Sequence, residues 1–358
     1  MDYSRRQQAL DVERESLRVD ALLITHLPNI RYLCGFTGSA GVLLVRAGRP
    51  VLFTDSRYTT QARAEVAGAR VVISSGSPLA TVTQFAQKNK ISGLGIESEH
   101  MTVGARTWLR RALGSKARLR EVGPVVEKYR MIKEAGEIEY IREAVNLGAR
   151  LLDTALETIR PGVTEAEVAA ELEYAARCAG AEGMSFETIV AAGPRSAMPH
   201  GRASAAAIPQ RGFVVLDFGV ILHGYCSDMT RTVHVGKISS AERSWYQAVR
   251  EAQGAAVYAV GAGVACGQVD RAARTTLRRA GFGRYFTHAT GHGVGLEIHE
   301  PPRIGRGQRE ALRAGMVVTV EPGVYVPGQG GVRIEDMVVV TSSGCDVLTP
   351  APKELIEL

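Results

Sequence analysis

The chain has 358 residues, a formal net charge of +6 at pH 7 and 45% hydrophobic residues. This length suits two domains, because single domains usually have about 100–200 residues. The hydrophobic content excludes a disordered or collagen-like chain. No run of about 18 apolar residues is present, so we expect no transmembrane helix and no membrane partner. Residues 1–15 lack the apolar core of a secretory signal, and we expect a cytoplasmic protein.

The positive charge and the cysteines do not indicate nucleic-acid or thiolate-metal binding. The 43 lysine and arginine residues are scattered along the chain among 37 acidic residues. The densest basic cluster, residues 116–120, is short and has no aromatic side chain between its charges, so we expect no nucleic-acid partner. The five cysteines are widely spaced and form no CxxC pair, which favours free thiols in a reducing compartment.

Residues 1–126 alternate short apolar runs with helical patterns. Such alternation predicts an α/β domain built on a sheet. The glycine-rich stretch at residues 35–41 lacks the GK[ST] ending of a phosphate loop. We expect strands at residues 21–24, 41–45, 51–53, 71–73 and 93–96, and helices at residues 57–66, 79–88 and 103–113.

Residues 127–358 combine long alanine-rich helical patterns with strand-like runs, which predicts an α+β domain with antiparallel hairpins. Thr164 and Glu167 are spaced as a capping box and predict the start of a helix. We expect helices at residues 134–159, 164–179, 241–260 and 269–280, and strands at residues 188–192, 213–220, 230–235, 317–326 and 332–341.

Two carboxylates flank the first hairpin of this second half. A turn at residues 222–223 places Asp217 directly opposite Asp228, whereas a turn one residue later makes them diagonal neighbours on the same face. Both arrangements bring like charges together, which destabilises a strand pair unless a cation lies between them. A solvent-facing or turn position for one aspartate is the structural alternative.

A second hairpin repeats this arrangement. Its turn near residues 327–331 sets Glu321 opposite Glu335 on strands expected at residues 317–326 and 332–341. Four acidic side chains at one site need about two divalent cations to be tolerated in a protein interior. The two hairpins together therefore predict a metal site.

Three of the eight histidines lie within twelve residues of one another, at His288, His292 and His299. The first two have the spacing of a helical zinc site, but the glycines at positions 291, 293 and 295 are unsuited to a helix. Glycines beside His292 instead suit a backbone that passes close to a metal or substrate. His200, in an expected loop, is a further candidate.

The motifs around these residues resemble those of the pita-bread metallopeptidases, which include prolidase, aminopeptidase P and methionine aminopeptidase, with creatinase as a metal-free relative. They occur in the family's order across residues 127–358. Residues 29–33 and 53–58 resemble the smaller amino-terminal domain of prolidases and aminopeptidases P. The matching motifs are Leu216-Asp217-Phe218-Gly219, Ser227-Asp228-Met229-Thr230-Arg231, Gly291-His292-Gly293-Val294-Gly295, Glu321-Pro322-Gly323 and Arg333-Ile334-Glu335-Asp336.

The resemblance implies a role for each matching residue. Asp228 and Glu335 correspond to the carboxylates that bridge two metal ions, and Glu321 is placed to act as general base and acid. His200 and His299 correspond to histidines that contact the substrate carbonyl and the tetrahedral intermediate. His288, Arg303 and Arg333 correspond to further substrate-contacting residues. The five implied metal ligands are Asp217, Asp228, His292, Glu321 and Glu335.

A ligand set of four carboxylates and one imidazole favours hard divalent ions, so we expect two Mn²⁺ ions, with Co²⁺ or Zn²⁺ as alternatives. The resemblance implies hydrolysis of Xaa-Pro bonds in small proline-containing peptides. A dipeptidase of the prolidase type is favoured because Arg303 resembles the arginine that some prolidases use on a dipeptide carboxylate. The alternatives are an aminopeptidase P and, more distantly, a pita-bread protein that binds a partner without catalysis. The resemblance also implies a homodimer.

Overall fold

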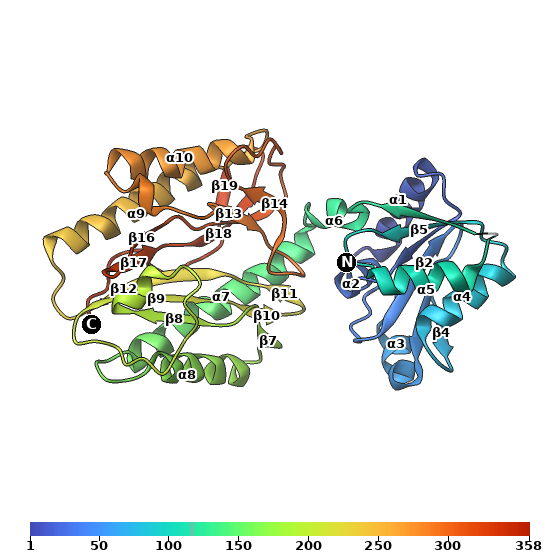
Figure 1. The fold of residues 1–358 in the computed structure, drawn as a ribbon, viewed down its shortest axis with the longest axis horizontal. Helices are drawn as coiled ribbons and strands as arrows, with labels where there is room; N and C mark the ends of the chain where they lie inside the picture. The colour runs from blue at the N-terminus through green and yellow to red at the C-terminus, as the bar shows by residue number, and fades with distance from the viewer. Residues whose placement is uncertain (116) are drawn as a thin grey trace. The chain divides into compact units, whose positions relative to one another are not determined.

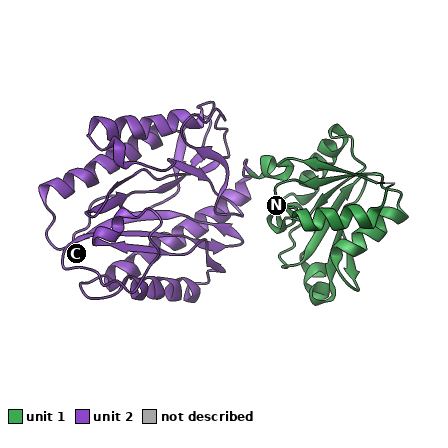
Figure 2. Ribbon diagram, viewed as in Figure 1, with its two compact units in different colours: residues 1–130 green, residues 131–358 purple. Residues whose placement is uncertain are grey.

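A computed structural model describes residues 1–115 and 117–358, so Lys116 of the basic cluster lies outside the described residues. The chain forms two compact units, Met1–Arg130 and Met131–Leu358 (Figure 2). The junction expected after residue 126 falls inside helix α6 (Val125–Arg130), which belongs to the first unit. Within the described residues, no helix is long and apolar enough to cross a membrane.

The first unit is a six-stranded sheet with the order β4-β3-β2-β1-β5-β6. The pairs β1–β2 and β2–β3 are antiparallel, and the other pairs are parallel. The five expected strands are present, whereas β6, α1, α2 and α6 were not predicted from the sequence. The helix expected at residues 57–66 begins as a 3₁₀ turn, η1 (Ser56–Tyr58). The elements are α1 (Tyr3–Ser16), β1 (Ala21–Ile24), α2 (Leu27–Cys34), β2 (Gly41–Arg46), β3 (Val51–Asp55), α3 (Thr59–Glu65), β4 (Arg70–Ser74), α4 (Pro78–Lys88), β5 (Gly93–Glu97), α5 (Val103–Leu113) and β6 (Arg118–Val122).

The second unit contains the four expected helices, α7 (Ala135–Thr158), α8 (Glu165–Cys178), α9 (Ser240–Tyr258) and α10 (Cys266–Arg279). The capping box that predicted α8 is confirmed, since the Glu167 amide donates to Thr164 Oγ1 at 3.2 Å and the Thr164 amide donates to Glu167 Oε2 at 2.7 Å. The strands are β7 (Gly183–Met184), β8 (Ile189–Ala192), β9 (Gly212–Phe218), β10 (Val220–Leu222), β11 (Tyr225–Cys226), β12 (Met229–Val235), β13 (Gly291–Gly293), β14 (Glu300–Ile304), β15 (Val317–Val320), β16 (Gly323–Val326), β17 (Gly330–Arg333), β18 (Asp336–Val340) and β19 (Cys345–Val347). Short 3₁₀ helices are η2 (Gly193–Ala197) and η3 (Gly283–Tyr285).

Two helix pairs cover the strands of this unit (Figure 1). Helices α7 and α8 share a buried core with β8, β9 and β12, in which Leu151 and Leu172 pack near Leu216. Helices α9 and α10 share another with β15 and β18, around Val249 and Val318. The strands that carry the carboxylates therefore lie between two apolar layers, which keeps their positions fixed.

The first hairpin has the register in which the turn lies one residue further along the chain and the two aspartates are diagonal neighbours. Its turn is at residues 223–224, between the paired residues Leu222 and Tyr225, and Asp217 lies opposite Thr230. Asp228 is therefore the diagonal neighbour of Asp217 on the same face. The strand expected at residues 213–220 is interrupted at Gly219, where β9 ends and β10 begins.

The second hairpin has the expected register, but its two strands are each interrupted. In β16–β17, Gly323 pairs with Arg333, and in β15–β18, Val320 pairs with Asp336, so Glu321 and Glu335 occupy matching positions. Both expected strands are split at these glutamates. The Glu321 amide donates to Thr290 O and the Glu335 amide donates to Thr230 O, so these amides leave the hairpin ladder. Pro322 has no amide hydrogen to restore it.

The Gly219 position predicts a sharp difference between two glycine substitutions. A Cβ atom added at Gly219 would lie 1.8 Å from Ser227 O, whereas one added at Gly254 in helix α9 meets nothing within 4 Å. We expect Gly219→Ala to lower the free energy of unfolding by about 1–3 kcal/mol or more, and Gly254→Ala to raise it by about 0.5–1 kcal/mol. Urea unfolding measures both, and equal stabilities would contradict the backbone contact.

Candidate metal centre

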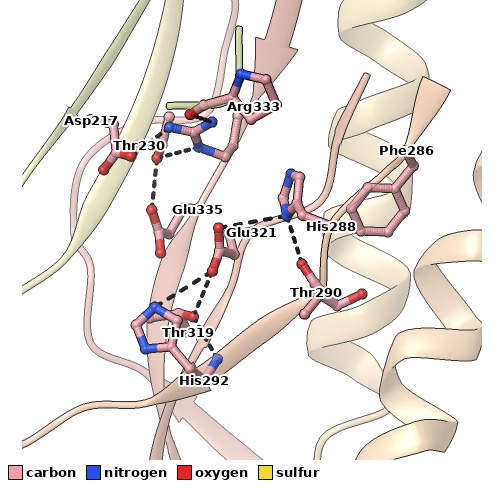
Figure 3. Close-up of polar contacts among 12 residues, drawn as sticks. Asp217, Thr230, Phe286, His288, Thr290, His292, Thr319, Glu321, Arg333 and Glu335 are labelled. Carbon is pink, nitrogen blue, oxygen red and sulfur yellow. Dashed lines mark hydrogen bonds and ion pairs between the residues drawn. The ribbon is translucent and has the colours of Figure 1, made fainter. Parts of the chain in front are cut away.

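Five side chains, on strands or at breaks beside them, converge on one site. Asp217 lies on β9, His292 on β13, and Asp228, Glu321 and Glu335 lie at breaks beside β12, β15 and β18. Figure 3 shows Asp217, Glu321, Glu335 and His292 directed towards a shared space. All five line a cavity of about 780 Å³. Residues separated by more than a hundred positions in the sequence therefore meet as expected.

The spacing of the donor atoms suits cations better than direct contacts. His292 Nε2 lies 3.5 Å from Asp228 Oδ2 and 3.5 Å from Glu321 Oε1. Ligand atoms of Asp228, His292 and Glu335 all lie within 4.8 Å of one another. Asp217 Oδ1 is buried and has no hydrogen-bond partner among the described residues. An oxygen-rich donor set with an unsatisfied buried oxygen fits divalent ions.

The electrostatics of the protein atoms alone are unfavourable for four carboxylates. Burial raises the pKa of Asp228 and Glu335 well above their ordinary values, and the neighbouring carboxylates raise these pKa values further. Burial also raises the pKa of Glu321 to about 7. Divalent cations at this site would stabilise the ionised forms.

Several polar side chains fix the orientation of the candidate ligands. Thr230 Oγ1 donates to Glu335 Oε2 at 2.7 Å, and Thr319 Oγ1 contacts Glu321 Oε1 at 3.4 Å. The Arg333 guanidinium is buried and donates to Asp217 Oδ2, Thr230 Oγ1, Tyr325 OH and Pro199 O. The guanidinium of Arg333, which was expected to contact substrate, therefore donates its hydrogen bonds within the protein, to the candidate ligand Asp217 and to groups beside it.

Thr230 and Thr319 had no predicted role, but strand alternation could have identified them. Each lies two residues from a candidate ligand, Asp228 or Glu321, and therefore on the same face of its strand. The sequence gives no comparable signal for Tyr325, whose hydroxyl meets Arg333 across the β16–β17 pair.

A buried ion network lies behind Glu335. Arg231 donates to the carbonyls of Thr230 and Glu335, and its Nη2 donates to Asp336 Oδ1 at 2.8 Å. The same guanidinium donates to the carbonyls of residues 351 and 352 near the carboxyl terminus. Lys353 Nζ donates to Asp336 Oδ2 at 2.6 Å. These hydrogen bonds tie the backbone next to the candidate ligand Glu335 to β12 and to residues 351–353. Groups that surround a metal site commonly fix its ligands in this way.

Helix α10 positions the loop that carries His288. Thr290 Oγ1 donates to Asp270 Oδ1 at 2.8 Å, and Arg274 Nε donates to Asp270 Oδ2 at 2.8 Å. Arg274 also donates to the carbonyls of Phe286 and His288. Because the Glu321 amide donates to Thr290 O, this helix supports the general-base candidate as well.

The predicted histidines and Arg303 all line the same cavity. His288 Nε2 lies 2.9 Å from Tyr325 OH, and burial lowers the pKa of His288 to about 3. Burial lowers the pKa of His292 to about 4, which keeps its imidazole neutral and able to bind a metal. His200, His299 and Arg303 are exposed at the cavity wall, and the His299 ring centroid lies 4.4 Å from that of His292.

This arrangement defines a two-unit protein, α/β followed by α+β, whose second unit carries a carboxylate–histidine cluster suited to divalent metal ions. Residues 139–342 match the family described as metallopeptidase family M24, and residues 6–132 match the creatinase/prolidase N-terminal domain. The chain therefore belongs to metallopeptidase family M24, whose metallopeptidases are dinuclear metal enzymes. The expected creatinase-type amino-terminal domain and pita-bread catalytic domain are confirmed.

Three similar proteins extend this assignment over the whole chain. An Xaa-Pro dipeptidase of Pyrococcus horikoshii is 37% identical over 342 residues, covering 94% of this chain and 95% of that protein. The structure of an Xaa-Pro dipeptidase from Bacillus anthracis is 41% identical with a TM-score of 0.96, and the match covers 100% of both chains. The structure of an X-Pro aminopeptidase from Thermotoga maritima is 36% identical with a TM-score of 0.91, covering 99% of this chain and 100% of that one.

Asp228→Asn should remove metal-induced stabilisation. A cation that binds only the folded state stabilises it by about 2.7 kcal/mol at a concentration of 100 Kd. We expect Mn²⁺ to raise the melting temperature of the wild type and of Asp153→Asn, an exposed control on α7, but not of Asp228→Asn. In EDTA, Asp228→Asn should be at least as stable as the wild type, since it removes one buried like charge. Equal Mn²⁺ responses in the wild type and Asp228→Asn would contradict the site.

The stabilisation by Mn²⁺ should increase with pH. Without cations, the folded state retains a proton on Glu321 up to about pH 7, whereas the unfolded chain releases it near 4.5, so this group makes the protein less stable as pH rises between these values. Cation binding needs the ionised carboxylates and reverses the trend. We expect a larger difference in melting temperature between Mn²⁺ and EDTA at pH 8 than at pH 6. An equal or smaller difference at pH 8 would contradict this electrostatic account.

Proposed function

We propose that the protein is a dinuclear-metal-dependent Xaa-Pro dipeptidase of the prolidase type. The observation that carries this proposal is the convergence of four carboxylates and His292 in one cavity, in a chain 41% identical to an Xaa-Pro dipeptidase over its full length. An aminopeptidase acting on longer Xaa-Pro peptides is the second candidate, supported by the similarity to the X-Pro aminopeptidase. A complete candidate ligand set argues against a purely binding protein.

We propose that the five converging side chains, Asp228 and Glu335 among them, would hold two divalent ions. The oxygen-rich set favours Mn²⁺, and Co²⁺ or Zn²⁺ remain alternatives. When bound, such ions supply Lewis-acid polarisation of the scissile carbonyl and lower the pKa of water. The ligands are Asp217, Asp228, His292, Glu321 and Glu335.

The side chains around the ions would carry out the proton transfers and stabilise the developing charge. Glu321 accepts a proton from the attacking water and returns it to the leaving proline nitrogen. His299 and His200, exposed at the cavity wall, donate hydrogen bonds to the carbonyl oxygen as it becomes an oxyanion. Arg333 and His288 act mainly by holding Asp217 and Tyr325 in place.

The cavity also offers a basis for proline recognition. An Xaa-Pro bond has no amide hydrogen, so recognition must use the ring and the groups on either side of it. Phe186, Ile189 and Ile298 provide an apolar wall for the pyrrolidine ring. Arg303 lies on the same wall without an acidic partner in the described parts of the chain and would bind the dipeptide carboxylate.

We propose a cytoplasmic location for the protein. The cysteines Cys34, Cys178, Cys226, Cys266 and Cys345 are all free thiols, which is in keeping with a cytoplasmic location. We propose a homodimer on the basis of the family resemblance. We also propose that the amino-terminal domain comprises residues 1–126 and the catalytic domain residues 127–358, with α6 at their junction.

Hydrolysis of Ala-Pro provides the test. We expect the Mn²⁺-loaded protein to cleave Ala-Pro and Gly-Pro, but not Ala-Ala. His299→Ala should retain the Mn²⁺-induced rise in melting temperature while losing about 10²–10³ in kcat, the usual cost of one oxyanion donor. Cleavage of only proline-free peptides would contradict the substrate proposal. Unchanged turnover in His299→Ala would remove that histidine from the site.

A further inference from the structure

A second cavity adjoins the cavity of the metal centre. Its volume is about 480 Å³, within the usual range for small-molecule sites. His288, Ala289 and Arg303 line both cavities, so the two share a wall at the arginine assigned above to the dipeptide carboxylate. A ligand that extends past Arg303 therefore has a formed space on the far side of this wall.

The lining of the second cavity is strongly basic. Four arginines line it, at positions 274, 284, 303 and 306, and no acidic side chain is among its described lining residues. Asp270 partly offsets the charge of Arg274. Arg303 and Arg306 are exposed and have no carboxylate within 4.0 Å in the described ranges. The cavity therefore offers at least two uncompensated guanidinium groups to an anion.

Two anions suit these guanidinium groups, a peptide carboxylate and free phosphate, because a guanidinium binds both in the same forked geometry. The shared wall favours the peptide. Each residue added after proline moves the terminal carboxylate by about 3.3–3.6 Å along an extended chain. A third residue would thus displace the carboxylate from Arg303 by about this distance, and the second cavity, which Arg303 also lines, is an adjoining space with further arginines.

We propose that the second cavity binds the terminal carboxylate of Xaa-Pro peptides longer than dipeptides, with Arg306 as its principal ligand. This proposal rests on the proposed function and extends its substrates to Xaa-Pro-Yaa tripeptides. The protein then combines dipeptidase and aminopeptidase activity, with Arg303 binding the carboxylate of the shorter substrate and Arg306 that of the longer one.

Steady-state kinetics with three peptides tests the assignment. The substrates are Ala-Pro, Ala-Pro-Ala and Ala-Pro-Ala amide, and the proteins are the wild type, Arg306→Gln and Arg279→Gln. Arg279 is exposed on α10 and lines neither cavity, so it matches the change in net charge. We expect Arg306→Gln to raise KM for Ala-Pro-Ala by about three- to tenfold, as for a partly exposed charged contact. Its kcat for Ala-Pro-Ala and its kinetics with Ala-Pro should not change.

Ala-Pro-Ala amide lacks the terminal carboxylate and so removes the same proposed contact as Arg306→Gln, from the side of the substrate. For the wild type, the amide should raise KM as much as Arg306→Gln does for the free acid, and the two changes together should cost no more than either alone. An equal KM increase in Arg279→Gln would mean that only overall charge matters and would overturn the proposal. Equal KM values for acid and amide would overturn it as well.

The failure of this proposal can be separated from failure of the proposed function. Cleavage of Ala-Pro without any cleavage of Ala-Pro-Ala would refute the second cavity alone. If neither peptide is cleaved, the proposed function fails, and ligand-detected NMR of Pro-Ala and its amide then tests the cavity independently. Arg306-dependent preference for the acid supports it, and equal binding of acid and amide overturns it. Arg306-dependent binding of inorganic phosphate without binding of Pro-Ala would assign the cavity to free phosphate and also overturn it.

Discussion

The packing of four carboxylates, three buried and Glu321 half-buried, around a single imidazole is the constraint on which the rest of the structure depends. In a protein interior such a cluster repels itself and loses hydration, and the raised pKa values of Asp228 and Glu335 express this cost. The strands that carry the cluster pack against two cores, one covered by α7 and α8 and the other by α9 and α10, and this packing keeps the cluster in place. Arg333 supplies positive charge to Asp217, and divalent ions would stabilise the ionised forms of the remaining carboxylates, which otherwise tend to keep their protons.

The strand breaks explain how one fold brings these groups together. At Glu321 and Glu335 the backbone leaves the hairpin, and each amide bonds to a neighbouring segment, at Thr290 and Thr230. The ligand-bearing strands are thereby tied to one another through the main chain. Arg231 and Asp336 then link this region to the carboxyl-terminal residues, so that side chains remote from substrate help fix the geometry of the ligands.

Much of this could be predicted from the sequence, because the relevant signals are local. Strand alternation placed Asp217 with Asp228 and Glu321 with Glu335, and the glycines around His292 excluded a helix. The choice between the two registers of the first hairpin depended on whether the turn begins at residue 222 or 223, which hydrophobic patterning does not settle. The breaks at the glutamates depend on tertiary hydrogen bonds and could not be foreseen.

The groups that were missed are mostly those whose role is created by packing. Helix α1 has apolar residues too sparsely spaced for a clear helical pattern, yet Leu10 is fully buried in it. Lys353 meets Asp336 only because the end of the chain returns to β12. No sequence motif singled out Arg306, and its proposed role depends on the cavity that it lines together with Arg303.

The proposed metal centre would hold two divalent ions among these five side chains. Electron paramagnetic resonance of the protein titrated with Mn²⁺ tests it most directly. We expect two ions to bind per chain and the spectrum of the fully loaded protein to show exchange coupling, because the two ions of a two-metal site lie about 3.5–4 Å apart. A single bound ion, or two ions with uncoupled spectra, would contradict the account.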